Sequence, residues 1–105
     1  MKLLFIGDIV GRPGRDIVVD AVAGLKIKHQ LDFVIANAEN AAGGSGLTPD
    51  IYKQLVTAGV DAITLGDHVY RRKEIYSVLQ NKDNIVRPAN LPDEAVGRQW
   101  TLIYG

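Results

Sequence analysis

Residues 3–8 of the 105-residue chain read LLFIGD, a continuous apolar run that ends in a glycine and an aspartate. The same arrangement returns as FVIANAEN at residues 33–40 and as AITLGDH at residues 62–68. An interval of about thirty residues is what a strand, a crossover helix and the next parallel strand require. We therefore expect three parallel strands whose polar ends lie at one edge of one sheet, where open α/β folds bind their ligands.

The residues between the first two runs predict a loop and a helix. Leu3–Ile6 shows no alternation of apolar and polar residues, which is typical of a strand buried on both faces. Residues 7–15 are expected to form a loop, and helical spacing of apolar residues continues from Ile17 to about His29. Phe33–Asn37 is the second expected strand.

Start and stop signals are clear for the second helix. Thr48 can cap it, Pro49 lacks the amide hydrogen that a first turn leaves unpaired, and Gly59 suits a left-handed C-terminal residue. The elements expected after it are a strand, a helix, a short strand and a final strand-like segment: Asp61–Leu65, Arg71–Leu79, Ile85–Val86 and Gln99–Tyr104.

These elements predict the fold class α/β, with a three-layer, mostly parallel sheet and flanking helices. A chain of 105 residues is of the usual size for one domain, so a single α/β domain over residues 1–105 is expected.

Composition excludes several classes of protein. Twelve basic and twelve acidic residues give no net charge, so we expect neither an extended nucleic-acid surface nor a membrane-binding one. No segment approaches the roughly 20 apolar residues of a membrane span. The chain has no cysteine, and its start lacks the shape of a signal peptide, so we expect a cytoplasmic protein.

The polar residues at the strand ends are candidate metal ligands. Asp8 is a hard oxygen donor, although loop aspartates often cap helices instead. Glu39 and Asn40 place a carboxylate and an amide side by side, which suits one or two cations and also suits an ordinary turn. Asp67 adds a third carboxylate, and His68 can act as a general acid or as a ligand. Their convergence favours a site.

The glycine-rich stretches carry weaker signals. Residues 7–15 (GDIVGRPGR) match neither dinucleotide-binding nor P-loop motifs. Gly43 and Gly44 could let backbone amides approach a phosphate, or could simply make a flexible loop. Arg12 and Arg15 could contact phosphate or be solvated, and the same holds for the run at residues 71–73.

Four motifs taken together carry a family resemblance. GDIVGRPGR (7–15), NAENAAGG (37–44), TLGDH (64–68) and RPANLP (87–92) resemble the amino-terminal half of the bacterial YmdB-like metallophosphoesterases, which act as 2',3'-cyclic-nucleotide phosphodiesterases. The resemblance implies half of a calcineurin-like sandwich. It also implies a site for two metal ions, with iron or manganese expected and zinc or magnesium as alternatives.

Residue roles follow from the resemblance. Asp8 would bind the first metal, Glu39 would bridge both, Asn40 would bind the second metal or orient phosphate, and Asp67 would also bind the second. His68 would give a proton to the leaving ribose oxygen. Phosphate binding is carried to Asn40, Gly43, Gly44 and Arg12.

The chain departs from the family pattern in two respects. The family usually has Asn where this chain has Asp67, which adds a negative charge to the site. Family members are also much longer, and their second half supplies further histidine ligands. We therefore expect this chain alone to bind one metal or none, and to join a missing second half or form a homo-oligomer.

The sequence leaves three functions open. The first is a phosphodiesterase, for small nucleotides or other phosphodiesters, that needs residues outside this chain. The second is a non-catalytic metal- or phosphate-binding module that forms a homo-oligomer. The third is a small domain that binds some other phosphorylated ligand at the same crevice.

Overall fold

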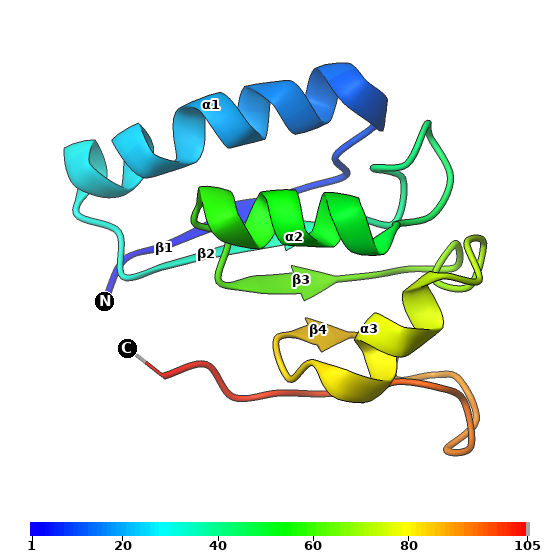
Figure 1. Cartoon of the computed structure of the whole chain (residues 1–105). Helices are drawn as coiled ribbons and strands as arrows, with labels where there is room; N and C mark the ends of the chain where they lie inside the picture. The colour runs from blue at the N-terminus through cyan, green and yellow to red at the C-terminus, as the bar shows by residue number, and fades with distance from the viewer. Residues whose placement is uncertain (105) are drawn as a thin grey trace.

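The computed structural model of the chain describes residues 1–104. Gly105, the last residue of the expected domain, lies outside the described residues. Strands and helices alternate, as β1 (Leu3–Ile6), α1 (Gly11–His29), β2 (Phe33–Asn37), α2 (Pro49–Ala58), β3 (Ala62–Thr64), α3 (Ile75–Asn81) and β4 (Ile85–Val86) (Figure 1). The strands pair in parallel in the order β1-β2-β3-β4. The expected α/β class with a parallel sheet is confirmed.

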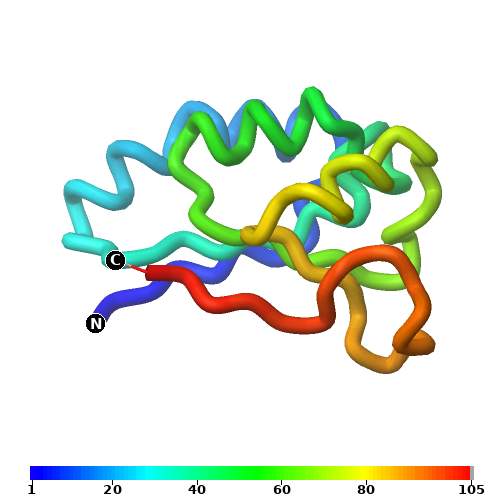
Figure 2. The backbone as a smooth tube through the Cα atoms, turned by 60° about the horizontal axis from the view of Figure 1, so that its bottom comes forward, coloured from blue at the N-terminus to red at the C-terminus, as the bar shows by residue number. Residues whose placement is uncertain are grey.

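All three helices cover the same face of this sheet (Figure 2). Each crossover steps to the next strand in the same direction, and crossovers of one hand then place every helix on one side. The register puts Ala36, Ile63 and Ile85 in one row across three strands, and all three are fully buried under the helices. Residues 1–104 thus form two layers, and the third layer of the expected fold is not among them.

The opposite face of the sheet is open. Leu3 and Phe5 of β1 are 53% and 56% exposed. Their neighbours in register on β2 are Phe33 and Ile35, which are half-buried. The prediction that Leu3–Ile6 is buried on both faces is therefore wrong for the described residues, because no helix crosses to this side.

Helix α1 begins at Gly11, within the segment predicted as a loop over residues 7–15. The proline does not prevent this, because Pro13 lies in the first turn, where an amide hydrogen has no partner inside the helix. The Gly11 amide instead donates to the Asn40 carbonyl at 3.0 Å. The start of α1 is thereby tied to the loop that follows β2.

The boundaries of α2 agree with the prediction. The Thr48 hydroxyl accepts a hydrogen bond from the Ile51 amide at 3.3 Å, Pro49 opens the helix, and Gly59 closes it with a φ of 118°. Local capping chemistry determines both ends of this helix.

Later elements are shorter than expected. β3 comprises three of the five predicted residues, and α3 begins at Ile75 rather than Arg71. Gln99–Tyr104 forms no strand, and only an isolated bridge joins Arg98 to Val86. Trp100 and Tyr104 are 72% and 84% exposed, so this segment lacks the packed neighbours that would make it a strand.

Tyr70 connects the segment after β3 to the loop before this tail. Its hydroxyl donates to the Val96 carbonyl at 2.6 Å. Burial raises the pKa of Tyr70, so the hydroxyl keeps the proton that it donates. None of the helices described within residues 1–104 is long and apolar enough to cross a membrane.

Candidate metal site

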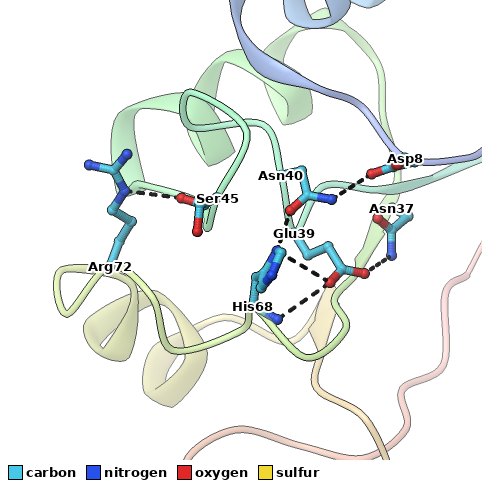
Figure 3. Close-up of polar contacts among 7 residues, drawn as sticks. All are labelled: Asp8, Asn37, Glu39, Asn40, Ser45, His68 and Arg72. Carbon is cyan, nitrogen blue, oxygen red and sulfur yellow. Dashed lines mark hydrogen bonds and ion pairs between the residues drawn. The ribbon is translucent and has the colours of Figure 1, made fainter.

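Polar side chains from three loops meet at the carboxyl edge of the sheet (Figure 3). Asp8 follows β1, Glu39 and Asn40 follow β2, and Asp67 and His68 follow β3. Because neighbouring parallel strands end side by side, residues far apart in sequence become neighbours here.

Three of these residues form a compact donor group. One ligand atom from each of Glu39, Asp67 and His68 lies within 4.8 Å of the other two. The Glu39 and His68 side chains are mostly buried, at 17% and 28% exposure, whereas Asp67 is exposed. Two carboxylate oxygens and an imidazole nitrogen at such separations can surround one cation.

Asn40 connects this group to Asp8. Its amide nitrogen donates to Asp8 Oδ1 at 2.7 Å, and its amide oxygen contacts His68 Nδ1. The backbone amide of His68 in turn donates to Glu39 Oε2 at 3.4 Å. Asn40 therefore fixes the spacing between the first and third strand ends.

The backbone of Asp8 is in a strained conformation. Its φ is 41°, in the left-handed region that residues with a side chain rarely adopt, although aspartate tolerates it better than most. Such strain gathers at functional sites, where the surrounding structure holds it in place. Here the Ile9 amide donates to the Asn37 carbonyl at 3.1 Å and holds the next residue against β2.

Two residues that sequence reasoning missed surround the Glu39 carboxylate. The Asn37 amide donates to Glu39 Oε1 at 3.3 Å. A Cβ atom at Gly66 would overlap this carboxylate, so any larger residue at this position would displace it. Asn37 stands inside the NAEN motif and Gly66 inside TLGDH, but nothing in either motif predicts the direction of the Glu39 side chain.

Two arginines donate hydrogen bonds to backbone carbonyls of the glycine-rich loop, residues 41–46. Arg72 donates from Nε to the Ser45 carbonyl at 3.1 Å and from Nη2 to the Ala42 carbonyl at 3.0 Å. Arg15 donates to the Ala41 carbonyl at 2.8 Å. Arg72 is exposed, as the solvation alternative predicted, but both guanidinium groups also donate to backbone carbonyls of this loop, a role that the sequence did not indicate.

The remaining predicted residues lie around this network. Gly43 and Gly44 both have positive φ, and the Gly44 amide donates to the Asn40 carbonyl at 3.0 Å. Arg12 is exposed on the first turn of α1 and is not part of the network described above. His29 is exposed at the far end of the same helix.

The donor set fits a metal ion. Carboxylate and amide oxygens suit hard divalent cations, and one imidazole widens the choice to manganese, iron and zinc. Asp8 joins the group of Glu39, Asp67 and His68 through Asn40, so three carboxylates converge on this edge. A bound cation would compensate their negative charge.

The fold and this donor set together define a class: α/β proteins with a candidate metal site at the carboxyl edge of a parallel sheet. Comparison of the sequence identifies the family. The chain belongs to the YmdB-like protein family, which it matches over residues 4–104.

Known relatives are considerably longer than this chain. The 2',3'-cyclic-nucleotide 2'-phosphodiesterase of Bacillus subtilis (strain 168) is 48% identical over 103 residues, which are 98% of this chain and 39% of the relative. A hypothetical protein from Thermus thermophilus matches in structure with a TM-score of 0.87 and 41% identity, over 93% of this chain and 38% of that one.

A novel phosphatase from Mycoplasma pneumoniae gives a TM-score of 0.86 and 41% identity, over 93% of this chain and 36% of its own. Its name and that of the Bacillus subtilis relative describe phosphate-ester chemistry. The chain spans less than half the length of each of these three proteins.

Proposed function

We propose that this chain carries the amino-terminal part of a metal-dependent phosphoesterase that hydrolyses phosphodiesters such as 2',3'-cyclic nucleotides by a two-metal mechanism. Residues outside this chain complete the site. The proposal rests on membership of the YmdB-like family and on the naming of the Bacillus subtilis relative.

The observation that carries the proposal is the donor group of Glu39, Asp67 and His68, joined through Asn40 to Asp8. Three carboxylates with one amide between them are a poor arrangement for an isolated protein surface, because like charges repel. The same arrangement is favourable around cations.

In the proposed site Asp8 would bind one metal, Glu39 would bridge two, and Asn40 and Asp67 would bind the second. Manganese suits these oxygen donors, and the histidines expected from the missing second half would suit iron. When bound, a pair of such ions stabilises charge on the phosphate oxygens and lowers the pKa of a water molecule. The additional charge of Asp67 strengthens cation binding and weakens attraction for an anionic substrate.

His68 is the proposed proton donor to the leaving ribose oxygen. Its Nδ1 faces the Asn40 oxygen and lies 3.9 Å from Glu39 Oε2. Nε2, on the other side of the ring, is the nitrogen left to face a substrate. Asn40 and Glu39 thereby orient the imidazole for proton transfer.

The phosphate would lie against the glycine-rich loop. Because the Gly44 amide already donates to Asn40, Gly44 contributes its backbone shape and the Gly43 amide is the proposed donor. Arg12, exposed on the first turn of α1, is the proposed second contact for a substrate oxygen.

We also propose that residues 1–105 act as one α/β unit and that its open sheet face is covered in the working protein. The exposed Leu3 and Phe5 support this, since apolar surface on a sheet face is stabilised by a packed layer. The cover is either the remainder of a longer protein or a second copy of this chain.

The test compares two substrates in the whole protein with manganese present. His68→Ala should lower kcat for 2',3'-cyclic AMP by roughly 10²- to 10⁴-fold, the usual contribution of a general acid. The loss should be much smaller for bis(p-nitrophenyl) phosphate, because its leaving group departs without a proton. Glu39→Gln should abolish both activities.

His29→Ala is the matched control and should leave both rates unchanged, because His29 is exposed and far from the strand ends. Equal loss on both substrates in His68→Ala would remove the proton-donor role. Full activity in Glu39→Gln, or activity that survives chelation of metal, would remove the metal-dependent mechanism itself.

A further inference from the structure

We propose that Asn37 is a positioning residue that holds the Glu39 carboxylate in the orientation needed to bridge metal ions. The inference rests on the proposed metal-dependent function and adds to it a residue outside the donor set.

The backbone of Asn37 is held on both sides. It is the last residue of β2 and pairs in register with Thr64 of β3. Its carbonyl accepts a hydrogen bond from the Ile9 amide at 3.1 Å, which ties it to the segment after β1. A side chain on a backbone fixed in this way is positioned more precisely than a side chain on a flexible loop.

The Asn37 side chain holds one of the two oxygens of Glu39. Its amide nitrogen donates to Oε1 at 3.3 Å, while the His68 backbone amide donates to Oε2 at 3.4 Å (Figure 3). Each oxygen therefore has one donor. A carboxylate oxygen has two acceptor positions, so each keeps one free for a cation.

The backbone of Gly66 limits movement of the Glu39 carboxylate on a third side. A Cβ atom built on Gly66 would overlap Oε1, Oε2 and Cδ of Glu39, so the carboxylate packs directly against this backbone. With Asn37 on one oxygen and His68 on the other, the plane of the carboxylate is fixed from three sides.

The unpaired oxygen of Asn37 supports the same assignment. Oδ1 is buried and has no hydrogen-bond partner, which is normally unfavourable. Rotating the amide by half a turn would bring Oδ1 against Glu39 Oε1 and place two acceptors in contact. The interaction with Glu39 therefore determines the amide orientation, and the unpaired oxygen is its cost.

Stability and metal binding should respond differently to a substitution of Asn37. Asn37→Leu removes the donor to Glu39 together with the unpaired buried oxygen, at similar side-chain size. We expect the thermal midpoint of the metal-free protein to stay the same or rise. A residue with only a structural role would lower the midpoint when its hydrogen bond is lost.

The experiment titrates Mn²⁺ into the whole, chelator-treated protein and follows free Mn²⁺ by electron paramagnetic resonance. Asn37→Leu should weaken Mn²⁺ binding by roughly 10- to 100-fold, the usual effect of losing a partner that orients a metal ligand. Asn37→Ala serves if the leucine variant does not fold.

Thr64→Val is the matched control, because Thr64 is the register partner of Asn37 on the same face of the sheet. It should bind Mn²⁺ like the wild type. If Glu39→Gln loses binding but all Asn37 variants retain it, the positioning role is overturned while the metal site stands. If the wild type itself binds no Mn²⁺, the proposed function falls along with the inference.

Discussion

Gly66 faces the carboxylate of Glu39 with no side chain between them. A Cβ atom there would overlap both carboxylate oxygens. The φ of Gly66 lies outside the left-handed region, so alanine is compatible with the backbone. The consequence of adding a methyl group is therefore confined to the position of Glu39.

We expect Gly66→Ala to raise the dissociation constant for Mn²⁺ by at least roughly 10-fold, measured by the same titration. The matched control is Gly7→Ala, because Gly7 also precedes a strand-end aspartate but has no atom within 4 Å of its Cβ position. Equal Mn²⁺ affinity in the two variants would show that the close approach of Gly66 has no role in the site.

Asp8 offers a second test, in which two substitutions should differ in stability but not in activity. Its φ of 41° suits glycine, whereas alanine in this region costs about 1 kcal/mol. Asp8→Gly should therefore be more stable to urea than Asp8→Ala by about 1 kcal/mol, while both variants lose the proposed phosphodiesterase activity of the whole protein. Equal unfolding free energies would show that the backbone relaxes once the carboxylate is gone.

The sequence predicts the residues that could bind a metal better than it predicts the residues that hold the Glu39 carboxylate in place. Asp8, Glu39 and His68 follow apolar runs, and parallel-strand geometry is enough to bring such residues together. The contacts of Asn37 and Gly66 depend on which way the Glu39 side chain turns. A rotamer is set by packing, and no periodicity or spacing in the sequence encodes it.

At the scale of elements, the guanidinium group of Arg72 joins the segment before α3 to the glycine-rich loop. It donates to the Ser45 and Ala42 carbonyls, and a Cβ at Gly46 would overlap Arg72. The loop that carries Gly43 and Gly44 is thereby connected to the segment that carries His68.

We expect Arg72→Ala to speed amide hydrogen exchange in residues 41–46 by roughly 10-fold, since losing charge-assisted hydrogen bonds lowers the cost of local opening. The matched control is Arg71→Ala, which removes an equal charge and keeps the Cβ that lies 3.0 Å from where a Cβ on Gly46 would be. Equal exchange rates in the two variants would contradict the bracing role of Arg72.

Arg87 explains one of the motifs that led to the family. It is 3% exposed, and its guanidinium donates to the carbonyls of Pro88, Pro92, Ala95 and Gly97. RPANLP is therefore a loop built around a buried arginine. Because these guanidinium donors are already bonded to backbone carbonyls, the position is structural rather than a substrate contact.

Elements with local signals are predicted well, and those with tertiary causes are not. Thr48 and Gly59 determine α2 through their own capping bonds. The start of α1 depends on the Asn40 carbonyl, which accepts from the Gly11 amide across the loop. Gln99–Tyr104 has the composition of a strand, but its side chains have too few neighbours to form one.

At the scale of the whole molecule, the one-sided placement of the helices leaves an apolar sheet face open. We expect the 105-residue chain to self-associate through this face when it is expressed alone, because Leu3 and Phe5 are more than half exposed there. Phe5→Lys should shift the sedimentation coefficient toward that of a monomer.

Ile17→Lys is the matched control, since Ile17 is 68% exposed on α1, away from that face. A wild-type chain that sediments as a monomer would contradict the expected association. An equal shift in both variants would locate the contact elsewhere. The topology itself was predictable from the spacing of the strands, but the absence of a covering layer within residues 1–104 required the three-dimensional structure.

The consecutive strand order has a consequence for biosynthesis. Each strand pairs with the one made just before it, so the sheet can grow from β1 without inserting a strand between two others. The Asn40–Asp8 hydrogen bond can form as soon as β2 and the residues just after it have emerged from the ribosome. Asp67 and His68 emerge later, so a nascent chain acquires its full donor group only after the third strand is in place.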